Sequence, residues 1–305
     1  MSIYHAHGKL LLTAEYFVLD GATALALPVK YGQSLDIATD RKDENLHWQS
    51  LDEKGNCWFE ATFDPSDFSI IDQNDEAIAI RLQSILKELK THHPPPTTRH
   101  SSLKTYLSFP RSWGLGTSST LIYLLAKWAG ADPFDLQFKI FGGSGYDIAC
   151  AGAEGPILYQ LKNKKPFVEG CEFSPSFADR IFFVYLGKKQ NSRKGIARYR
   201  AESSGQRAEK RIAEISALTD LFLKEKTPEG FEKLIVEHEK LVGSAVGLPR
   251  AKSVYFNDFW GEVKSLGAWG GDFVLVTSDR PAEETKDYFN EKGFEVFIPY
   301  REMVL

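Results

Sequence analysis

The most constraining feature of this sequence is a strand, a glycine-rich turn and a helix that follow one another without a break. The predicted strand ends at Phe109-Pro110, the turn contains Gly114 and Gly116, and Thr117-Ser118-Ser119 open an apolar helix. Glycines let the backbone approach an anion closely, and the first N–H groups of a helix favour negative charge. The stretch is therefore a candidate phosphate site in which the Ser118 hydroxyl suits Mg²⁺. A tight turn with Ser and Thr capping a core helix is the alternative, because the Walker lysine and the Rossmann spacing are missing.

Two charged residues are further candidates for a role at such a site. Asp147 follows the turn Gly142–Gly145, where a carboxylate can orient or deprotonate a nucleophile or, alternatively, cap a helix. Lys9 precedes the apolar run Leu10–Leu12; an edge lysine is the ordinary interpretation, and near Asp147 and a phosphate it would neutralise developing charge. Ser265–Asp272 is a further glycine-rich loop before a strand, which a hairpin or bulge explains equally well.

The strongest local charge lies between Lys188 and Arg211. Nine Lys and Arg stand there against two Glu, which gives +7 in a chain whose formal net charge is −4. A solvated basic face and the mouth of a site for a multiply anionic substrate are both consistent with this pattern.

Composition excludes several classes of protein. The 305 residues are 43% hydrophobic and 26% charged, as in ordinary globular proteins, and the pI near 6.0 gives no global reason to expect nucleic-acid or membrane-surface binding. Three scattered cysteines are too few for a disulfide framework or a zinc site. We find no signal-peptide pattern and no apolar stretch long enough to span a membrane. We therefore expect a soluble, cytoplasmic protein, either monomeric or homodimeric.

The periodicity of the chain indicates an α+β architecture. The first third predicts strands, including Lys9–Leu12, Tyr16–Leu19, Ala24–Val29 and Ser34–Ala38, and is followed by a helix over Glu76–Leu89 and a strand over Thr98–Phe109. The apolar helix after the glycine-rich turn covers Ser118–Trp128. The second half predicts the following elements: strands Ile181–Leu186, Phe273–Thr277 and Phe294–Ile298, and helices Glu209–Lys224, Glu229–Val242 and Glu283–Lys292.

Several spaced motifs together resemble the GHMP kinases, which include galactokinases and homoserine, mevalonate and phosphomevalonate kinases. The motifs are Gly8–Gly21, Pro110–Ser119, Gly143–Ala151 with its Gly-Tyr-Asp-Ile-Ala string, and Leu266–Phe273. They occur in the order of the family and cover nearly the whole chain. Within the superfamily the resemblance is nearest to the bacterial phosphomevalonate kinases, although mevalonate kinases share most of these positions.

The resemblance implies a two-domain fold, with a ribosomal-S5-like ATP-binding domain over residues 1–172 and a ferredoxin-like domain over residues 173–305. It implies an ATP- and Mg²⁺-dependent kinase in which Asp147 and Lys9 are catalytic and Ser118 binds the metal ion. The ATP phosphates would be bound by Gly114, Leu115, Gly116, Thr117, Ser118 and Ser119. The acceptor would be bound by Glu15, Tyr16, Lys188, Ser192, Arg193, Gly270, Gly271 and Asp272.

The acceptor expected from this resemblance is 5-phosphomevalonate, a small anion. Mevalonate is the first alternative; a diphosphomevalonate decarboxylase and a non-catalytic ligand-binding relative are two others. Three departures from the family pattern bear on the choice. Leu136 stands where many mevalonate kinases have a magnesium-binding Glu, Ala14 replaces the usual Gly before Glu15, and Trp269 replaces a Gly in the last motif.

Overall fold

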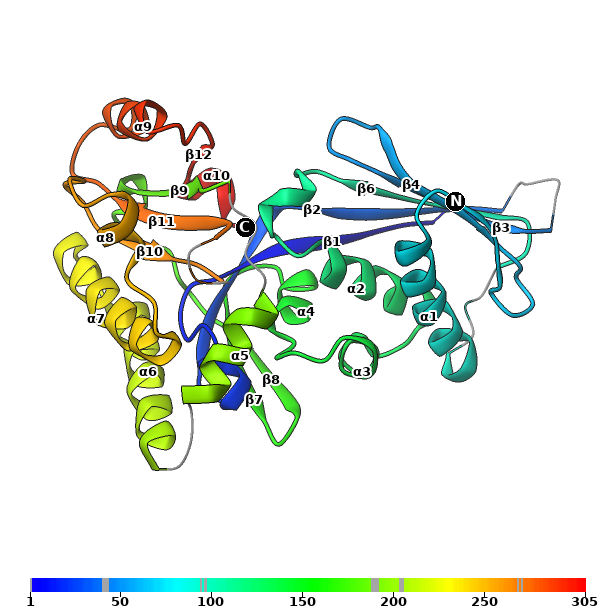
Figure 1. Cartoon of the computed structure of the whole chain (residues 1–305), viewed down its shortest axis with the longest axis horizontal. Coiled ribbons are helices and arrows are strands. Elements are labelled where there is room, and N and C mark those ends of the chain that lie inside the picture. Colours follow the sequence, from blue (N-terminus) through cyan, green and yellow to red (C-terminus); the bar gives the residue numbers. More distant parts are fainter. Residues whose placement is uncertain are drawn as a thin grey trace. The chain divides into compact units, whose positions relative to one another are not determined.

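The computed structural model describes residues 2–39, 44–93, 95, 98–187, 192–202, 206–267, 269 and 271–305, and at residues 192–194, 202, 206 and 207 the backbone only (Figure 1). The chain divides into two compact units that alternate along the sequence. The first unit is Met1–Gly8, Tyr31–Arg111 and Leu115–Gly152; the second is Lys9–Lys30, Ser112–Gly114 and Ala153–Leu305. Strands β1 (Ser2–Leu11) and β2 (Ala24–Ala38) run from one unit into the other. The two consecutive domains expected around residue 172 stay a prediction.

The sheet of the first unit is mixed. Strand β6 (Ser101–Leu107) pairs antiparallel with the second half of β2 and parallel with β3 (Leu46–Leu51). Antiparallel pairing then adds β4 (Cys57–Phe63) and β5 (Ile70–Gln73). Alternate residues of β3 are buried, as expected for a strand with one face on the core.

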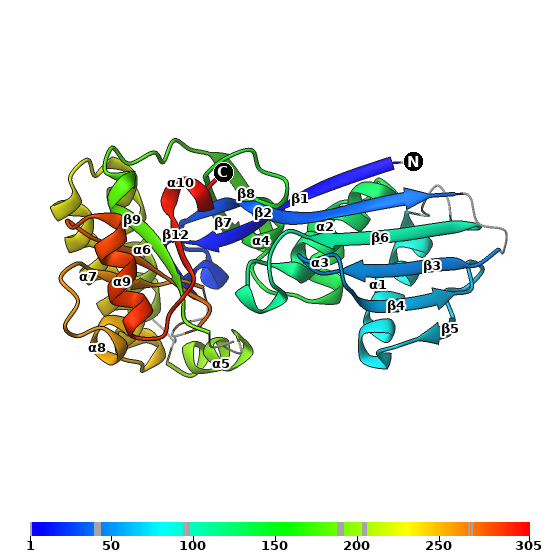
Figure 2. The same cartoon turned by 90° about the horizontal axis from the view of Figure 1, so that it is seen from above.

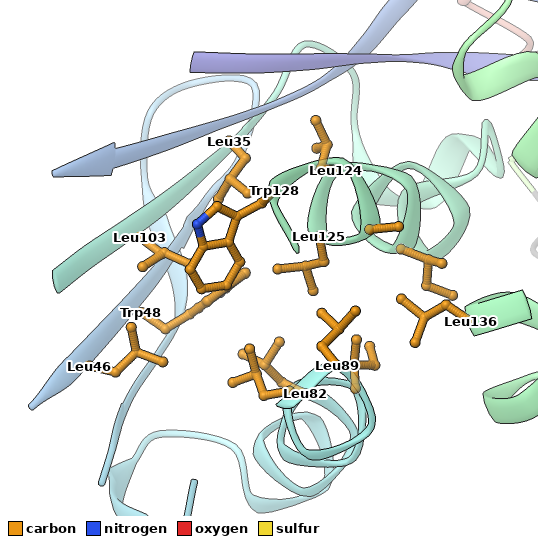
Figure 3. Close-up of a cluster of buried hydrophobic side chains, with 14 of the residues drawn as sticks. Leu35, Leu46, Trp48, Leu82, Leu89, Leu103, Leu124, Leu125, Trp128 and Leu136 are labelled. Atoms are coloured by element: carbon orange, nitrogen blue, oxygen red, sulfur yellow. The ribbon is translucent and has the colours of Figure 1, made fainter. Parts of the chain in front are cut away.

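Among the described residues of the first unit, the α-helices are α1 (Glu76–His92), α2 (Thr117–Ala129), α3 (Pro133–Ile140) and α4 (Tyr146–Ala151). Strand residues such as Trp48 meet α1 at Leu82 and Leu89 and α2 at Leu125 and Trp128 in a hydrophobic core (Figure 3). Because α1 and α2 each place an apolar face on this core, the helices predicted at Glu76–Leu89 and Ser118–Trp128 are confirmed.

The second unit contains a separate antiparallel sheet in the order β10-β11-β9-β12. Its strands are β9 (Ile181–Tyr185), β10 (Val263–Ser265), β11 (Phe273–Thr277) and β12 (Phe297–Pro299). Every residue of β11 is buried, which requires cover on both faces of the sheet. The hairpin of β7 (Ile157–Lys162) and β8 (Lys165–Gly170) pairs separately with the first half of β2.

Helices surround the sheet of the second unit (Figure 2). The long ones are α5 (Ser192–Glu202), α6 (Gln206–Lys224), α7 (Pro228–Val246) and α9 (Ala282–Glu291), and the short ones are α8 (Ala251–Tyr255) and α10 (Tyr300–Met303). The predicted helices at α6, α7 and α9 and the predicted strands at β9 and β11 are confirmed. The α+β class is therefore correct.

One expected strand is wrong. Tyr16–Leu19 reads as an apolar strand in the sequence, but Phe17–Asp20 form the 3₁₀ helix η1. Tyr16 precedes it with φ +66°, a left-handed conformation that no strand contains. Helix α5 was not predicted, because its composition shows charge rather than an apolar face.

Candidate active site

The glycine-rich loop begins in the second unit and ends in the first. Residues Ser112–Gly114 belong to the second unit and Leu115 onward to the first. Gly114 and Gly116 have φ +67° and +102°, values that favour glycine strongly. Gly116 is the residue that caps the N-terminus of α2. Both glycines therefore serve the turn that delivers the chain to the helix.

The start of α2 has the chemistry of an anion site. The Gly116 carbonyl accepts the Thr120 N–H at 2.9 Å and the Ser119 hydroxyl at 2.9 Å. Ser119 is buried and its hydroxyl supports the turn, whereas Ser118 is exposed. The preceding N–H groups of the helix have no partner within the helix itself and carry the positive end of its dipole. Phosphate oxygens fit this end, with Ser118 available to a metal ion.

Lys9, Gly114 and Asp272 meet in the second unit although they are far apart in sequence. The Lys9 ammonium donates to the Gly114 carbonyl at 2.8 Å. A Cβ placed on Gly114 would lie 2.1 Å from Asp272 Oδ2, so a side chain at this position would displace the Asp272 carboxylate. The three residues line a small pocket with Gly267, of about 10 Å³. The structure thus joins the first, second and last sequence motifs at one point.

The loop is packed from the other side by aromatic residues of the second unit. Trp113 meets Phe273 edge to face at 5.5 Å between ring centroids. The Tyr185 hydroxyl donates to the Ser112 carbonyl at 2.8 Å. Sequence analysis did not identify Trp113, Tyr185 or Phe273 as site residues, because apolar aromatic residues give no chemical signal. Their contacts hold the loop in place.

Asp147 lies in the first turn of α4 in the first unit. Gly145, with φ +83°, precedes the helix, and the Ile148 N–H donates to Asp147 Oδ1 at 3.1 Å. The side chain is half-buried. The helix N-terminus stabilises the charged form of a carboxylate at this position. The role of Asp147 opposite an acceptor, beside Lys9, stays a prediction.

Glu15 is not exposed as an acceptor ligand would be. Its carboxylate is 1% exposed and receives the Lys264 ammonium at 2.6 Å, while His238 Nε2 lies 3.1 Å away. Glu239 belongs to the same buried cluster and accepts the Ser265 N–H at 3.0 Å. Glu15 is thus a buried, ion-paired carboxylate, and its role toward an acceptor stays a prediction. Sequence reasoning missed Lys264, His238 and Glu239, since single charges in apolar elements read as edge or surface residues.

The protonation states in this cluster follow from burial and charge. Burial opposes ionisation of Glu15, but the Lys264 ammonium outweighs it and holds the pKa of Glu15 below its usual value. Burial raises the pKa of Glu239 to about 8. Burial, together with Lys264, lowers the pKa of His238. Burial therefore favours the protonated form of Glu239 and the neutral form of His238 beside the ion pair of Glu15 and Lys264.

The remaining predicted acceptor residues are only partly described. Lys188 and Gly270 lie outside the described residues. Ser192 and Arg193 form the first turn of α5, with their backbone alone described. Gly271 and Asp272 lead into β11. Tyr16 is buried and its hydroxyl accepts the Trp269 N–H at 3.0 Å.

Within the described ranges, no group of three or more His, Cys, Asp or Glu side chains is placed to hold a metal ion. Leu136, at the position of the family's magnesium-binding Glu, is buried in the hydrophobic core of the first unit. A Mg²⁺ bound largely by phosphates and water needs few protein ligands, so Ser118 remains compatible with it. No helix among the described residues is long and apolar enough to cross a membrane.

Comparison with solved structures identifies the fold. The mevalonate kinase of Methanococcus jannaschii aligns with a TM-score of 0.67 at 18% identity, over 95% of each chain. The Streptococcus pneumoniae phosphomevalonate kinase, in complex with phosphomevalonate and AMPPNP, aligns with a TM-score of 0.70 at 17% identity, over 97% of this chain and 99% of that one. A Lactococcus lactis galactokinase with galactose aligns with a TM-score of 0.66 at 11% identity, over 97% and 93%. The chain has the GHMP kinase fold.

The GHMP kinase fold is established here by structure alone. No protein-family model matches the sequence, and no curated protein matches it. The solved structures nevertheless align over nearly their full length. The resemblance seen in the motifs and the fold seen in the structure agree.

Proposed function

We propose that this protein is an ATP-dependent phosphotransferase that acts on a small anionic acceptor, 5-phosphomevalonate. The observation that carries the proposal is the meeting of Lys9, Gly114 and Asp272 at the start of the glycine-rich loop. A lysine held against a loop of this kind neutralises charge that develops on a transferred phosphoryl group. The same loop ends at the anion-favouring N-terminus of α2.

The ATP phosphates bind to Gly114–Ser119 in this proposal. The backbone N–H groups of the loop and the first turn of α2 bind the phosphate oxygens, and the exposed Ser118 hydroxyl contributes to the metal site. Mg²⁺ supplies charge neutralisation on the β- and γ-phosphates when bound. Lys9 holds its position through the Gly114 carbonyl and presents its charge next to the loop.

The transfer breaks the bond between the γ-phosphorus and the β–γ bridging oxygen and forms a bond from that phosphorus to an acceptor oxygen. ADP leaves with the bridging oxygen. A phosphate acceptor is mostly ionised near neutral pH, with a second pKa of about 6, so no proton has to be removed. A hydroxyl acceptor must lose a proton, and Asp147 is the carboxylate proposed to take it.

The charge around α5 favours the acceptor with two anionic groups. The stretch from Lys188 to Arg211 has a net charge of +7, and a carboxylate together with a phosphate matches it better than a carboxylate alone. The Streptococcus pneumoniae neighbour was solved with phosphomevalonate, which supports the same choice. Mevalonate is the alternative acceptor, in keeping with the Methanococcus jannaschii neighbour.

The test is ADP release from Mg·ATP by the purified protein, with 5-phosphomevalonate and mevalonate offered separately. Turnover with 5-phosphomevalonate alone supports the proposal. Turnover with mevalonate alone assigns the protein to phosphorylation of the hydroxyl. Release of carbon dioxide from diphosphomevalonate assigns it to decarboxylation, and nucleotide binding without ADP release under any acceptor assigns it a binding role.

A pair of lysine variants controls this assay. Lys9→Met removes the charge at the loop and is expected to lower kcat by at least about 10²-fold, because it removes charge stabilisation in the transition state. Lys165→Met removes an exposed charge on β8 and is expected to leave kcat unchanged. Equal effects of the two substitutions would contradict the role given to Lys9.

A further inference from the structure

The turn that contains Tyr16 is conformationally strained and is held by contacts with buried residues. Ala14 and Tyr16 have φ +62° and +66°, left-handed values that side chains disfavour. The Ala14 N–H donates to His238 Nε2 at 3.0 Å, and Glu15 between them is bound to Lys264. Strained residues persist where the surrounding structure fixes them, and they gather at functional sites. The buried cluster therefore dictates where the Tyr16 side chain lies.

The Tyr16 hydroxyl holds the loop Gly267–Asp272. It accepts the Trp269 N–H at 3.0 Å. The Trp269 indole is buried: it is 3% exposed and its Nε1 donates to the Pro249 carbonyl at 3.1 Å. The loop is thus attached at residue 269 through its backbone to Tyr16 and through its side chain to Pro249. The large residue that replaces a glycine here anchors the loop.

Helix α5 is packed directly against the same tyrosine. A Cβ placed on Gly195 would lie 2.4 Å from the Tyr16 hydroxyl oxygen and under 3 Å from two ring carbons. Glycine inside a helix is unfavourable by itself, and this contact explains its presence. The tyrosine has no room to retreat, because its hydroxyl is bonded to Trp269 and its ring stacks on Tyr199.

A second contact, one helical turn along α5, also joins this helix to the segment that contains Tyr16. Tyr199 is four residues after Gly195, so both lie on one face of the helix. Its ring stacks on Tyr16 with 6.0 Å between centroids and meets Phe17 edge to face at 5.2 Å. Its hydroxyl donates to Asp20 at 2.7 Å, and Arg200 forms an ion pair with the same carboxylate.

We propose that Tyr16 is a positioning residue that fixes helix α5 and Trp269 relative to each other for binding of the anionic acceptor. The proposal rests on the proposed function for the identity of that acceptor. Its physical basis is that the Tyr16 side chain contacts both the helix and Trp269. The cations of α5 bind an anion well only if the helix is held in one place before the anion arrives.

The first test uses a substitution that favours helix formation in α5 and disrupts its contact with Tyr16. Gly195→Ala raises the helix propensity of α5 but puts a methyl group into Tyr16. It is expected to raise KM for 5-phosphomevalonate by about tenfold or more, with KM for ATP nearly unchanged. Ala197→Gly, on the exposed face of α5, is the matched control: it lowers helix propensity and leaves the acceptor KM unchanged. Equal effects of the two variants would overturn the proposal.

The second test does not depend on activity. Tyr16→Phe keeps the ring and removes the oxygen that accepts the Trp269 N–H, so hydrogen exchange in a peptide spanning Trp269 is expected to speed up. In Gly195→Ala, exchange in α5 is expected to speed up despite the better helix former. Unchanged exchange in both variants would overturn the proposal.

The two measurements separate the two ways of failing. A wild-type protein that transfers phosphate to neither acceptor refutes the proposed function, and faster exchange in the variants still supports the positioning role. Active protein with unchanged acceptor KM in Gly195→Ala refutes the positioning role and leaves the proposed function intact.

Discussion

The Lys264 ammonium lies 2.6 Å from the Glu15 carboxylate, and the two side chains are 0% and 1% exposed. These residues are 249 positions apart in the sequence. The protein interior solvates charge poorly, so it strengthens the attraction between two opposite charges. For the same reason, either charge is costly when it is buried without its partner. The pair lies under the strained turn that carries Tyr16, so its integrity bears on both stability and the candidate site.

Removal of one partner of this pair is expected to be strongly destabilising. Lys264→Met leaves the Glu15 carboxylate buried without its counter-ion and should lower the free energy of unfolding by about 3–5 kcal/mol. Urea unfolding followed by circular dichroism measures this loss. The double variant Glu15→Leu with Lys264→Met removes both charges and should recover most of the stability. A single variant as stable as the wild type would show that the pair is not buried as described.

Glu239 is expected to make stability fall as pH rises. Its pKa is raised to about 8 from 4.5 in the unfolded chain, so between these values the native protein holds a proton that the unfolded chain has lost. Each bound proton of difference changes the free energy of unfolding by about 1.4 kcal/mol per pH unit. The contribution is complete below pH 4.5 and is lost progressively up to about pH 8.

Glu239→Gln removes this titration and should be increasingly more stable than the wild type as pH rises from 5 to 8. Melting temperatures of the two proteins at each pH measure the difference in stability. The titration of groups that both proteins share cancels in this difference. Glu237→Gln, exposed on the same helix, should follow the wild-type curve. Parallel curves for wild type and Glu239→Gln would rule out a raised pKa at this position.

The absence of a side chain at Gly114 is expected to be required for full activity with ATP. Gly114→Ala puts a Cβ 2.1 Å from Asp272 Oδ2 and should lower kcat/KM for ATP by about 10²-fold or more, because the loop must shift. Gly130→Ala is the matched control, with φ +66° and no atom within 4 Å of the added Cβ. Both variants bear the left-handed cost of about 1–2 kcal/mol. If both lowered kcat/KM equally, backbone strain rather than the contact would be responsible.

The effect of Asp147→Asn is expected to depend on the acceptor. With a hydroxyl acceptor the loss of the base should lower kcat by about 10²–10⁴-fold. With 5-phosphomevalonate the reacting oxygen is already ionised, so the loss should be smaller. Asp135→Asn, exposed on α3, should change neither rate. Unchanged turnover of Asp147→Asn with every acceptor would remove Asp147 from the reaction.

Local pattern predicted much of this protein. The apolar periodicity of α2, α6 and α7 and the continuous apolar run of β11 identify these elements, because a helix or strand that packs on a core must repeat apolar residues at its own period. The glycine-rich turn before α2 is equally visible, since left-handed backbone conformations require glycine at Gly114 and Gly116. The order of the motifs pointed to the fold that the solved structures then matched.

Tertiary structure alone decided the rest. Tyr16–Leu19 has the composition of a strand, yet it forms a strained turn and a 3₁₀ helix, in which the Tyr16 hydroxyl accepts the N–H of Trp269, 253 positions away. Glu15 reads as a candidate ligand and lies in a buried ion pair. Charge and periodicity describe a residue and its near neighbours, whereas burial and ion pairing depend on segments that only the folded chain brings together.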